Sequence, residues 1–169
     1  MILRPERPDD RTASIEVELA AFREPEEARI VEAVRDEPGS FALVAEDGGE
    51  VIGHVQMAAA WVGSVEVLSL GPIGVMPTHQ RRGIGSALVA AALEEARARG
   101  SCAVILLGSP AYYGARDFVP AGRYGLANPF AGVLEDGFEI GEEDFQIAVL
   151  DESHASTLAG EVRWHPAFG

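Results

Sequence analysis

The sequence contains no lysine: its 13 basic residues are all arginine, and they stand against 27 aspartate and glutamate residues. Without lysine, the chain cannot use a Schiff-base lysine or the lysine of a P-loop. The formal net charge of −14 also argues against broad binding to nucleic acid or to an anionic membrane, because both need a basic face. An acidic protein suits a cationic or amine ligand, although acidity is most often a solubility feature.

Cysteine and long apolar segments are also scarce. The single cysteine, Cys102, excludes an internal disulfide and a cysteine-rich metal site. No apolar run approaches the roughly 20 residues that a membrane-spanning helix needs, and the first residues show no secretion signal. The four histidines lack the spacing of a metal site, so we predict no metal. We expect a cytoplasmic enzyme or binding protein with a single domain over residues 1–169.

Hydrophobic periodicity predicts alternating helices and strands. A first helix begins at Asp9 or Asp10 and has apolar residues at helical spacing, namely Ile15, Leu19 and Phe22. A second helix begins at Glu24-Pro25, because proline is favoured in the first turn. Strands are predicted at 2–5, 41–45, 51–60, 65–75, 103–107 and 145–150.

The middle of the chain predicts a strand–helix–strand unit. Gly71-Pro72 interrupts the strand 65–75 and predicts a kink, because proline lacks a donor for the ladder. The helix 86–99 has one apolar face, and the unbroken apolar run 103–107 is typical of a strand covered on both faces. The two strands should be parallel, with a right-handed crossover. The predicted fold class is α/β (α+β), with a mixed, mostly antiparallel sheet around this parallel unit; the C-terminal segment 125–169 carries fewer such patterns.

The segment between this strand and this helix, Gln80-Arg81-Arg82-Gly83-Ile84-Gly85-Ser86, carries the clearest chemical signal. Two glycines separated by one residue allow a tight turn that a ligand can approach closely. At a helix N-terminus, amide donors and the helix dipole favour an anion, and two adjacent arginines add positive charge. A P-loop would need lysine, and a dinucleotide-binding loop would need a third glycine where Leu88 stands. We therefore predict another phosphate-bearing ligand.

This segment resembles the Q/R-x-x-G-x-G/A motif of the GCN5-related N-acetyltransferases, the GNAT superfamily. The order of predicted elements from Met1 to about Phe118, roughly two thirds of the chain, is also similar to that family. The resemblance implies that acetyl-CoA is the co-substrate and that loop amides bind its pyrophosphate. It also implies that the kinked strand pairs with the pantetheine arm and splays from its parallel neighbour. The implied cofactor-binding residues are Ile73, Gly74, Val75, Arg81, Arg82, Gly83, Ile84, Gly85 and Ser86.

A second match, Tyr113-Gly114-Ala115-Arg116-Asp117-Phe118, is similar to the family's Tyr-x-x-x-Gly-Phe segment. The resemblance implies that Tyr113 is the general acid for the departing thiolate, a role that suits a phenol because it is protonated at neutral pH. Asp117 departs from the pattern, since the family usually has glycine there. A change in the turn after the helix would alter the direction of the Tyr113 side chain. Tyr112 is the competing candidate, and packing is the alternative role of both tyrosines.

The sequence does not identify the base that removes a proton from an attacking amine. Where the family frequently has a glutamate, this chain has Ser69, which cannot act as a base. Glu66 on the same strand and His54 on the preceding strand are the candidates, and a structural or solvated role is the alternative for each. The missing glutamate also leaves open a non-catalytic acyl-CoA-binding module.

The resemblance implies an N-acetyltransferase in which a primary amine attacks acetyl-CoA directly, within a ternary complex. A small-molecule amine is favoured over a protein terminus as acceptor. Dimers are common in the family, so a homodimer is left open. The aromatic tail around Trp164 is expected to dock on the domain or to line the acceptor side, and it resembles the end of a bacterial subfamily whose substrates are mostly unassigned.

Overall fold

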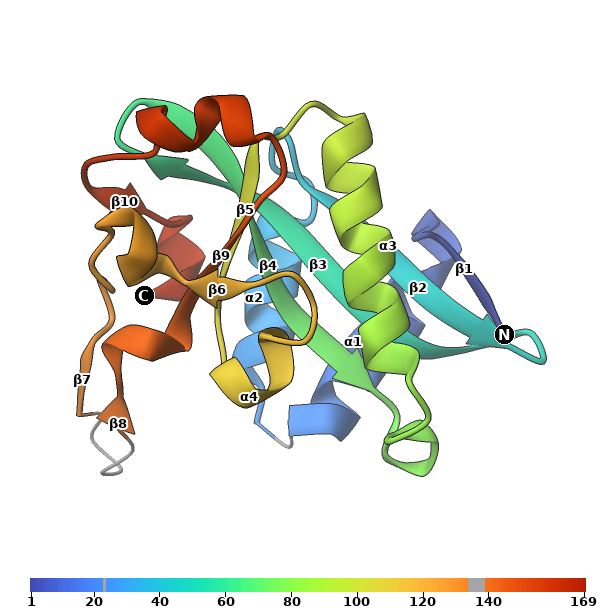
Figure 1. The fold of residues 1–169 in the computed structure, drawn as a ribbon. Helices are drawn as coiled ribbons and strands as arrows, with labels where there is room; N and C mark the ends of the chain where they lie inside the picture. The colour runs from blue at the N-terminus through green and yellow to red at the C-terminus, as the bar shows by residue number, and fades with distance from the viewer. Residues whose placement is uncertain (23, 134–138) are drawn as a thin grey trace. The chain divides into compact units, whose positions relative to one another are not determined.

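The computed structural model describes residues 1–22, 24–133 and 139–169 (Figure 1). The chain forms two compact units. Unit 1 comprises residues 1–59, 70–95 and 165–169, and unit 2 comprises residues 60–69 and 96–164. Strands β3 (Glu50–Val62) and β4 (Val65–Val75) contribute residues to both units. None of the helices in the described ranges is long and apolar enough to cross a membrane.

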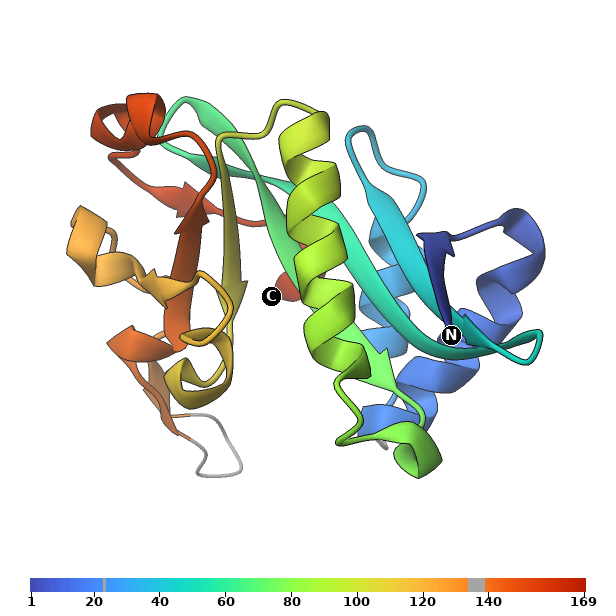
Figure 2. The same ribbon diagram turned by 45° about the vertical axis from the view of Figure 1, so that its right-hand side comes forward.

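Unit 1 is a sheet with helices on its two faces. Strand β1 (Ile2–Pro5) pairs antiparallel with β2 (Phe41–Asp47), and β2 pairs antiparallel with β3. Helix α3 (Ile84–Ala98) covers one face, whereas α1 (Arg11–Phe22) and α2 (Glu26–Val34) cover the other (Figures 1 and 2). Two glycines mark these faces: a Cβ at Gly53 would touch α3, and a Cβ at Gly74 would touch α1.

The predicted strand–helix–strand unit is confirmed. Strands β4 and β5 (Ala103–Leu107) pair in parallel through Leu68–Val104 and Ser69–Ile105. The apolar face of α3 is buried as its spacing predicts, with no more than 3 % exposure at Leu88, Val89, Ala92, Leu93 and Ala96. The helix ends at Ala98, and Gly100 follows it with a φ of 82°, in the left-handed region that glycine adopts without strain. At the predicted interruption of β4, Gly71 has a φ of 142° and the Gly71–Pro72 peptide bond is cis.

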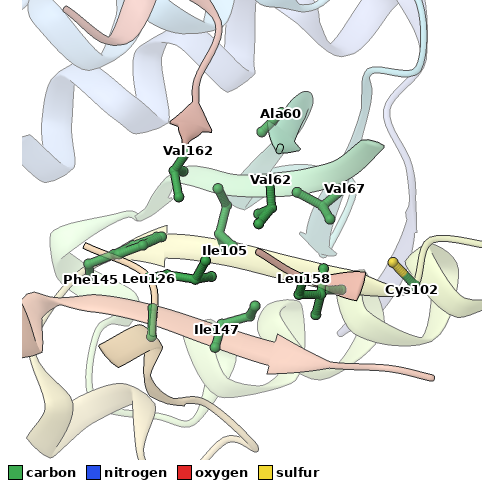
Figure 3. Packing of buried hydrophobic residues seen from close by; sticks show 12 residues of the cluster. Ala60, Val62, Val67, Cys102, Ile105, Leu126, Phe145, Ile147, Leu158 and Val162 are labelled. Carbon is green, nitrogen blue, oxygen red and sulfur yellow. The ribbon is translucent and has the colours of Figure 1, made fainter. Parts of the chain in front are cut away.

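Unit 2 is built on β5 and β9 (Phe145–Val149), which pair antiparallel. Strand β9 also pairs with β6 (Val119–Pro120), and β10 (Val162–Arg163) pairs with the end of β3. Apolar side chains from these strands and from the connecting segments form one core (Figure 3). Cys102 belongs to it, and burial raises the pKa of its thiol.

The C-terminal part is more structured than its loop-like composition suggests. Strands β7 (Gly132–Val133) and β8 (Glu139–Ile140) form a separate two-stranded sheet. Trp164 packs on the core of unit 2, with its ring 6.0 Å from that of Phe145, which accords with the predicted docking of the aromatic tail. Within the residues that the structure describes, the other helical segments are α4 (Pro110–Tyr113) and six short 3-10 turns: Pro8–Asp10, Pro77–His79, Ala121–Tyr124, Glu142–Asp144, Glu152–Thr157 and Pro166–Phe168.

Helix α1 forms where its spacing predicts, but it buries an unexpected face. Leu19 is 44 % exposed and Phe22 is 39 % exposed, although both lie on the apolar side of the helix. The side chains that are buried instead are Ser14, Val17 and Glu18. Two of these three are polar, so the packing of α1 is decided by partners on the sheet and not by its apolar periodicity.

Candidate functional site

The loop between β4 and α3 forms a compact turn in unit 1. The side chain of Gln80 closes the turn, because its Nε2 donates a hydrogen bond of 3.0 Å to the carbonyl oxygen of Val75. Arg81 and Gly83 have φ values of 61° and 82°, both in the left-handed region. The amide of Ala87 donates to the carbonyl of Gly83 at 3.0 Å. The backbone amides before Ala87 therefore belong to the first turn of α3, where no acceptor lies within the helix.

This turn suits an anionic ligand. A Cβ built at Gly83 would have no other atom within 4 Å, so the backbone is open to close approach there. The helix dipole places partial positive charge at this end of α3, and the exposed side chains of Arg81 and Arg82 add two full charges. The residues from Arg81 to Ser86 therefore fit a pyrophosphate group.

The end of β4 leads directly into this turn. Ile73 and Val75 are half-buried and Gly74 is buried. The amide of Met76 donates to the carbonyl of Ile52 on β3 at 2.9 Å, which ties the end of β4 to its neighbour. The strand residues 73–75 and the loop residues 81–86 thus belong to the same stretch of unit 1.

Tyr113 lies at the end of α4 in unit 2. Its ring packs on that of Phe118 at 5.8 Å and on that of Tyr112 at 4.8 Å. It also lies against Gly108, where a Cβ would collide with it. Burial, with a further contribution from Tyr112, raises the pKa of Tyr113 to about 12. The phenol is therefore a proton donor throughout the neutral range.

The turn after α4 explains the departure at Asp117. Asp117 has a φ of 65°, a conformation that glycine adopts freely and that aspartate tolerates better than most residues. The aspartate therefore keeps the backbone conformation that a glycine would provide. Tyr112 differs from Tyr113 in being 38 % exposed, and the guanidinium of Arg116 lies 3.6 Å from its ring centre.

The two sequence candidates for the base lie in different surroundings. Glu66 is exposed on β4, in unit 2. His54 on β3 is completely buried in unit 1, and its Nδ1 lies 2.6 Å from Oε1 of Glu18. Ser69 is also completely buried. His54 therefore faces a protein carboxylate and not solvent.

Glu18 is the residue that the sequence reasoning missed. It is completely buried on α1, and its Oε2 would lie 2.8 Å from a Cβ at Gly74, within the predicted pantetheine-binding strand. Burial raises the pKa of Glu18, the contact with His54 lowers it, the charge of Glu27 raises it, and the backbone amide of Gly74 lowers it. A signal is present in the sequence: Ser14 and Glu18 form a polar pair at i,i+4 spacing, on the same side of the helix as Val17.

Comparison with known proteins identifies the family to which this chain belongs. Residues 9–119 match the model of the acetyltransferase (GNAT) family. The chain belongs to this family. It is 27 % identical to the uncharacterized N-acetyltransferase YhbS of Escherichia coli K12 over 172 residues, which is 99 % of this chain and 98 % of that protein. It is 30 % identical to the uncharacterized N-acetyltransferase YjhQ of the same strain over 123 residues, 68 % of each chain.

Solved GNAT structures are similar over nearly the whole chain. The crystal structure of YhbS from E. coli in complex with CoA has a TM-score of 0.87 at 27 % identity, and the match covers 99 % of this chain and 91 % of that one. A GNAT acetyltransferase from Brucella melitensis in complex with acetyl-CoA has a TM-score of 0.73 at 28 % identity, with 99 % and 97 % covered. The predicted family and fold class are confirmed, and the protein is a GNAT N-acetyltransferase whose co-substrate is acetyl-CoA.

Proposed function

We propose that this GNAT protein acetylates a primary amine of a small molecule, by direct attack on acetyl-CoA within a ternary complex, using one acetyltransferase domain over residues 1–169. The observation that carries the proposal is the turn at the N-terminus of α3, where Gly83 leaves open space and two arginines supply charge. The net charge of −14 supports an acceptor that is a cation in solution.

Each part of the chain has a defined role in this proposal. The amides and side chains of residues 81–86 hold the pyrophosphate, and the backbone of residues 73–75 pairs with the pantetheine arm. A strand amide near Val75 polarises the thioester carbonyl. Tyr113 gives its phenolic proton to the departing thiolate, and its pKa of about 12 keeps that proton on the phenol until the thiolate forms.

Binding of CoA is tested by two matched variants at the ends of α3. Gly83 and Gly100 both have a φ of 82° and both leave open space where a Cβ would stand. Gly83→Ala and Gly100→Ala should therefore lower stability by a similar amount, about 1 kcal/mol. Only Gly83→Ala should weaken CoA binding in calorimetry, by at least tenfold. Equal affinity of the two variants for CoA would contradict the assignment of the loop.

Turnover separates an enzyme from a non-catalytic acyl-CoA-binding module, which the serine at position 69 left open. Thiol release from acetyl-CoA is measured against a panel of small primary amines. Tyr113→Phe should lower kcat about 10²-fold or more and leave CoA affinity nearly unchanged, because only the proton donor is removed. Tyr112→Phe is the matched control and should retain kcat. Binding of CoA without turnover by the wild type on any amine would favour the binding module.

A further inference from the structure

A group of buried charged residues lies on the face of unit 1 that α1 and α2 cover. Glu18 and His54 at its centre are both completely buried. Glu18 Oε1 and His54 Nδ1 lie 2.6 Å apart. The other carboxylate oxygen, Oε2, is buried and makes no hydrogen bond of ordinary geometry among the described residues, and the backbone amide of Gly74 lies close enough to lower the pKa of Glu18. A carboxylate oxygen has two acceptor sites, so Oε2 can still accept from a ligand or a water molecule.

The second carboxylate oxygen, Oε2, is directed at the strand predicted to hold acetyl-CoA. The Oε2 atom of Glu18 would lie 2.8 Å from a Cβ at Gly74, and its Cδ would lie 3.1 Å from it. Only a residue without a side chain leaves room for the carboxylate at this position. Glycine at 74 thus brings a carboxylate against the backbone of β4, between Ile73 and Val75.

Charged side chains from the neighbouring elements surround Glu18 and His54. Glu6, which follows β1, places Oε1 3.8 Å from Nε2 of His54 and 3.7 Å from a guanidinium nitrogen of Arg35, at the end of α2. Glu27 on α2 acts on Glu18 as a nearby negative charge. Glu6 also lies in the field of Arg11 on α1, so arginines and carboxylates both surround the pair of Glu18 and His54.

We propose that Glu18 takes the proton from the ammonium group of the acceptor, through one bridging water on Oε2, and that His54 is the positioning residue that holds its carboxylate against β4. The inference rests on the proposed function and deepens it, since it supplies the base that the sequence did not identify. It also gives His54, one of the two sequence candidates, a role through Glu18.

The proton balance of the reaction is complete with this assignment. The acceptor ammonium loses one proton to the Glu18 carboxylate and becomes a neutral amine with a free electron pair. As the C–N bond forms and the C–S bond breaks, Tyr113 donates its proton to the thiolate and regains one from the amide nitrogen. Glu18 then returns its proton to solvent, so that one proton is released for each amide formed. Burial raises the pKa of Glu18, which brings it closer to the neutral range in which a base is most effective.

The test compares Glu18→Gln with Glu16→Gln, a change of the same chemistry at an exposed position of the same helix. With an amine that the wild type acetylates, Glu18→Gln should lower kcat/KM at pH 7 by about 10²-fold or more. The deficit should shrink as the pH rises toward the pKa of the amine, because solvent then supplies the neutral nucleophile. CoA affinity should stay unchanged, and Glu16→Gln should match the wild type in every measurement.

Two further variants keep the test informative if Glu18→Gln folds poorly. Glu18→Asp keeps a carboxylate but draws it back by one methylene, so it should retain part of the rate and the acidic limb of the pH profile. His54→Gln should move that limb to higher pH, because the contact with His54 lowers the pKa of Glu18. A merely structural role would leave the shape of the pH profile unchanged in all three variants.

The outcomes separate this inference from the proposed function. If the wild type binds CoA but releases no thiol with any amine, the proposed function fails, and the inference fails with it. If the wild type turns over and Glu18→Gln has the same rate and pH profile, only the inference is overturned. Loss of rate by a constant factor at every pH would also overturn it, because a missing proton acceptor must matter less at high pH.

Discussion

Helices α1 and α3 cover opposite faces of the sheet in unit 1, and they differ in the kind of side chain that they bury. The buried face of α3 is entirely apolar, as its spacing predicts. Helix α1 buries Ser14 and Glu18 and leaves Leu19 and Phe22 partly exposed. Packing alone explains α3, whereas α1 gives up apolar burial to place a carboxylate against His54 and Gly74. A local rule broken in this way is most common at functional positions.

The largest effect should come from the core contact of α3. Leu88 is completely buried, and its Cδ1 would lie 3.0 Å from a Cβ at Gly53. Leu88→Ala should lower the free energy of unfolding by about 3 kcal/mol, because the cavity cannot fully collapse. Urea denaturation should show a lower midpoint with an unchanged m-value. A loss below about 1 kcal/mol would show that α3 packs less tightly than its burial indicates.

A second prediction compares the glycines that face the two helices. A Cβ at Gly53 would crowd Leu88 and Ile84 at 3.0 and 3.2 Å, and a Cβ at Gly74 would crowd Glu18 Oε2 and Val17 at 2.8 and 3.2 Å. Alanine at either position should cost about 1–3 kcal/mol of stability. The cost at Gly74 should depend on pH, because the crowded atom belongs to a titrating carboxyl. If each variant lost the same free energy of unfolding at pH 5 and at pH 8, the predicted pH dependence at Gly74 would be wrong.

The third prediction concerns pH and the buried carboxyl alone. Because its pKa is raised above the ordinary 4.5, folded Glu18 binds a proton more tightly than unfolded Glu18 does. Its contribution to stability is therefore fully present below pH 4.5 and is lost as the pH rises through the raised pKa. Relative to the wild type, Glu18→Gln should become progressively more stable as the pH rises from 4.5 toward neutrality. Denaturation of both proteins across that range measures the difference, and the opposite trend would contradict the assigned shift.

The smallest effect should come from the outward face of α1. Leu19 is 44 % exposed, so Leu19→Gln should change the free energy of unfolding by no more than about 0.5 kcal/mol. Thermal melting of Leu19→Gln and Leu88→Ala under the same conditions compares the loss of stability caused by a change in each helix. A loss comparable to that of Leu88→Ala would mean that the apolar side of α1 is covered in solution.

Much of the fold follows from patterns that lie close together in the sequence. The apolar spacing of α3, Gly100 just after its end and the unbroken run of β5 each specify their element locally, and the Gly83–Gly85 loop predicts an anion site. The candidate base could not be found in this way, because Glu18 and His54 are far apart in the chain and meet only when α1 packs on β3. The same holds for Gly74, whose missing side chain matters only because α1 lies against it.

The sequence by itself determined the family and the co-substrate, and it predicts the loop that should receive acetyl-CoA, because a helix start and two glycines act through neighbouring backbone. Tertiary structure alone decided which face of α1 is buried. A helix has several faces that could be buried, and the choice depends on the partners offered by other strands. Here those partners are an imidazole and a strand without a side chain at one position, and together they accept a carboxylate in the interior.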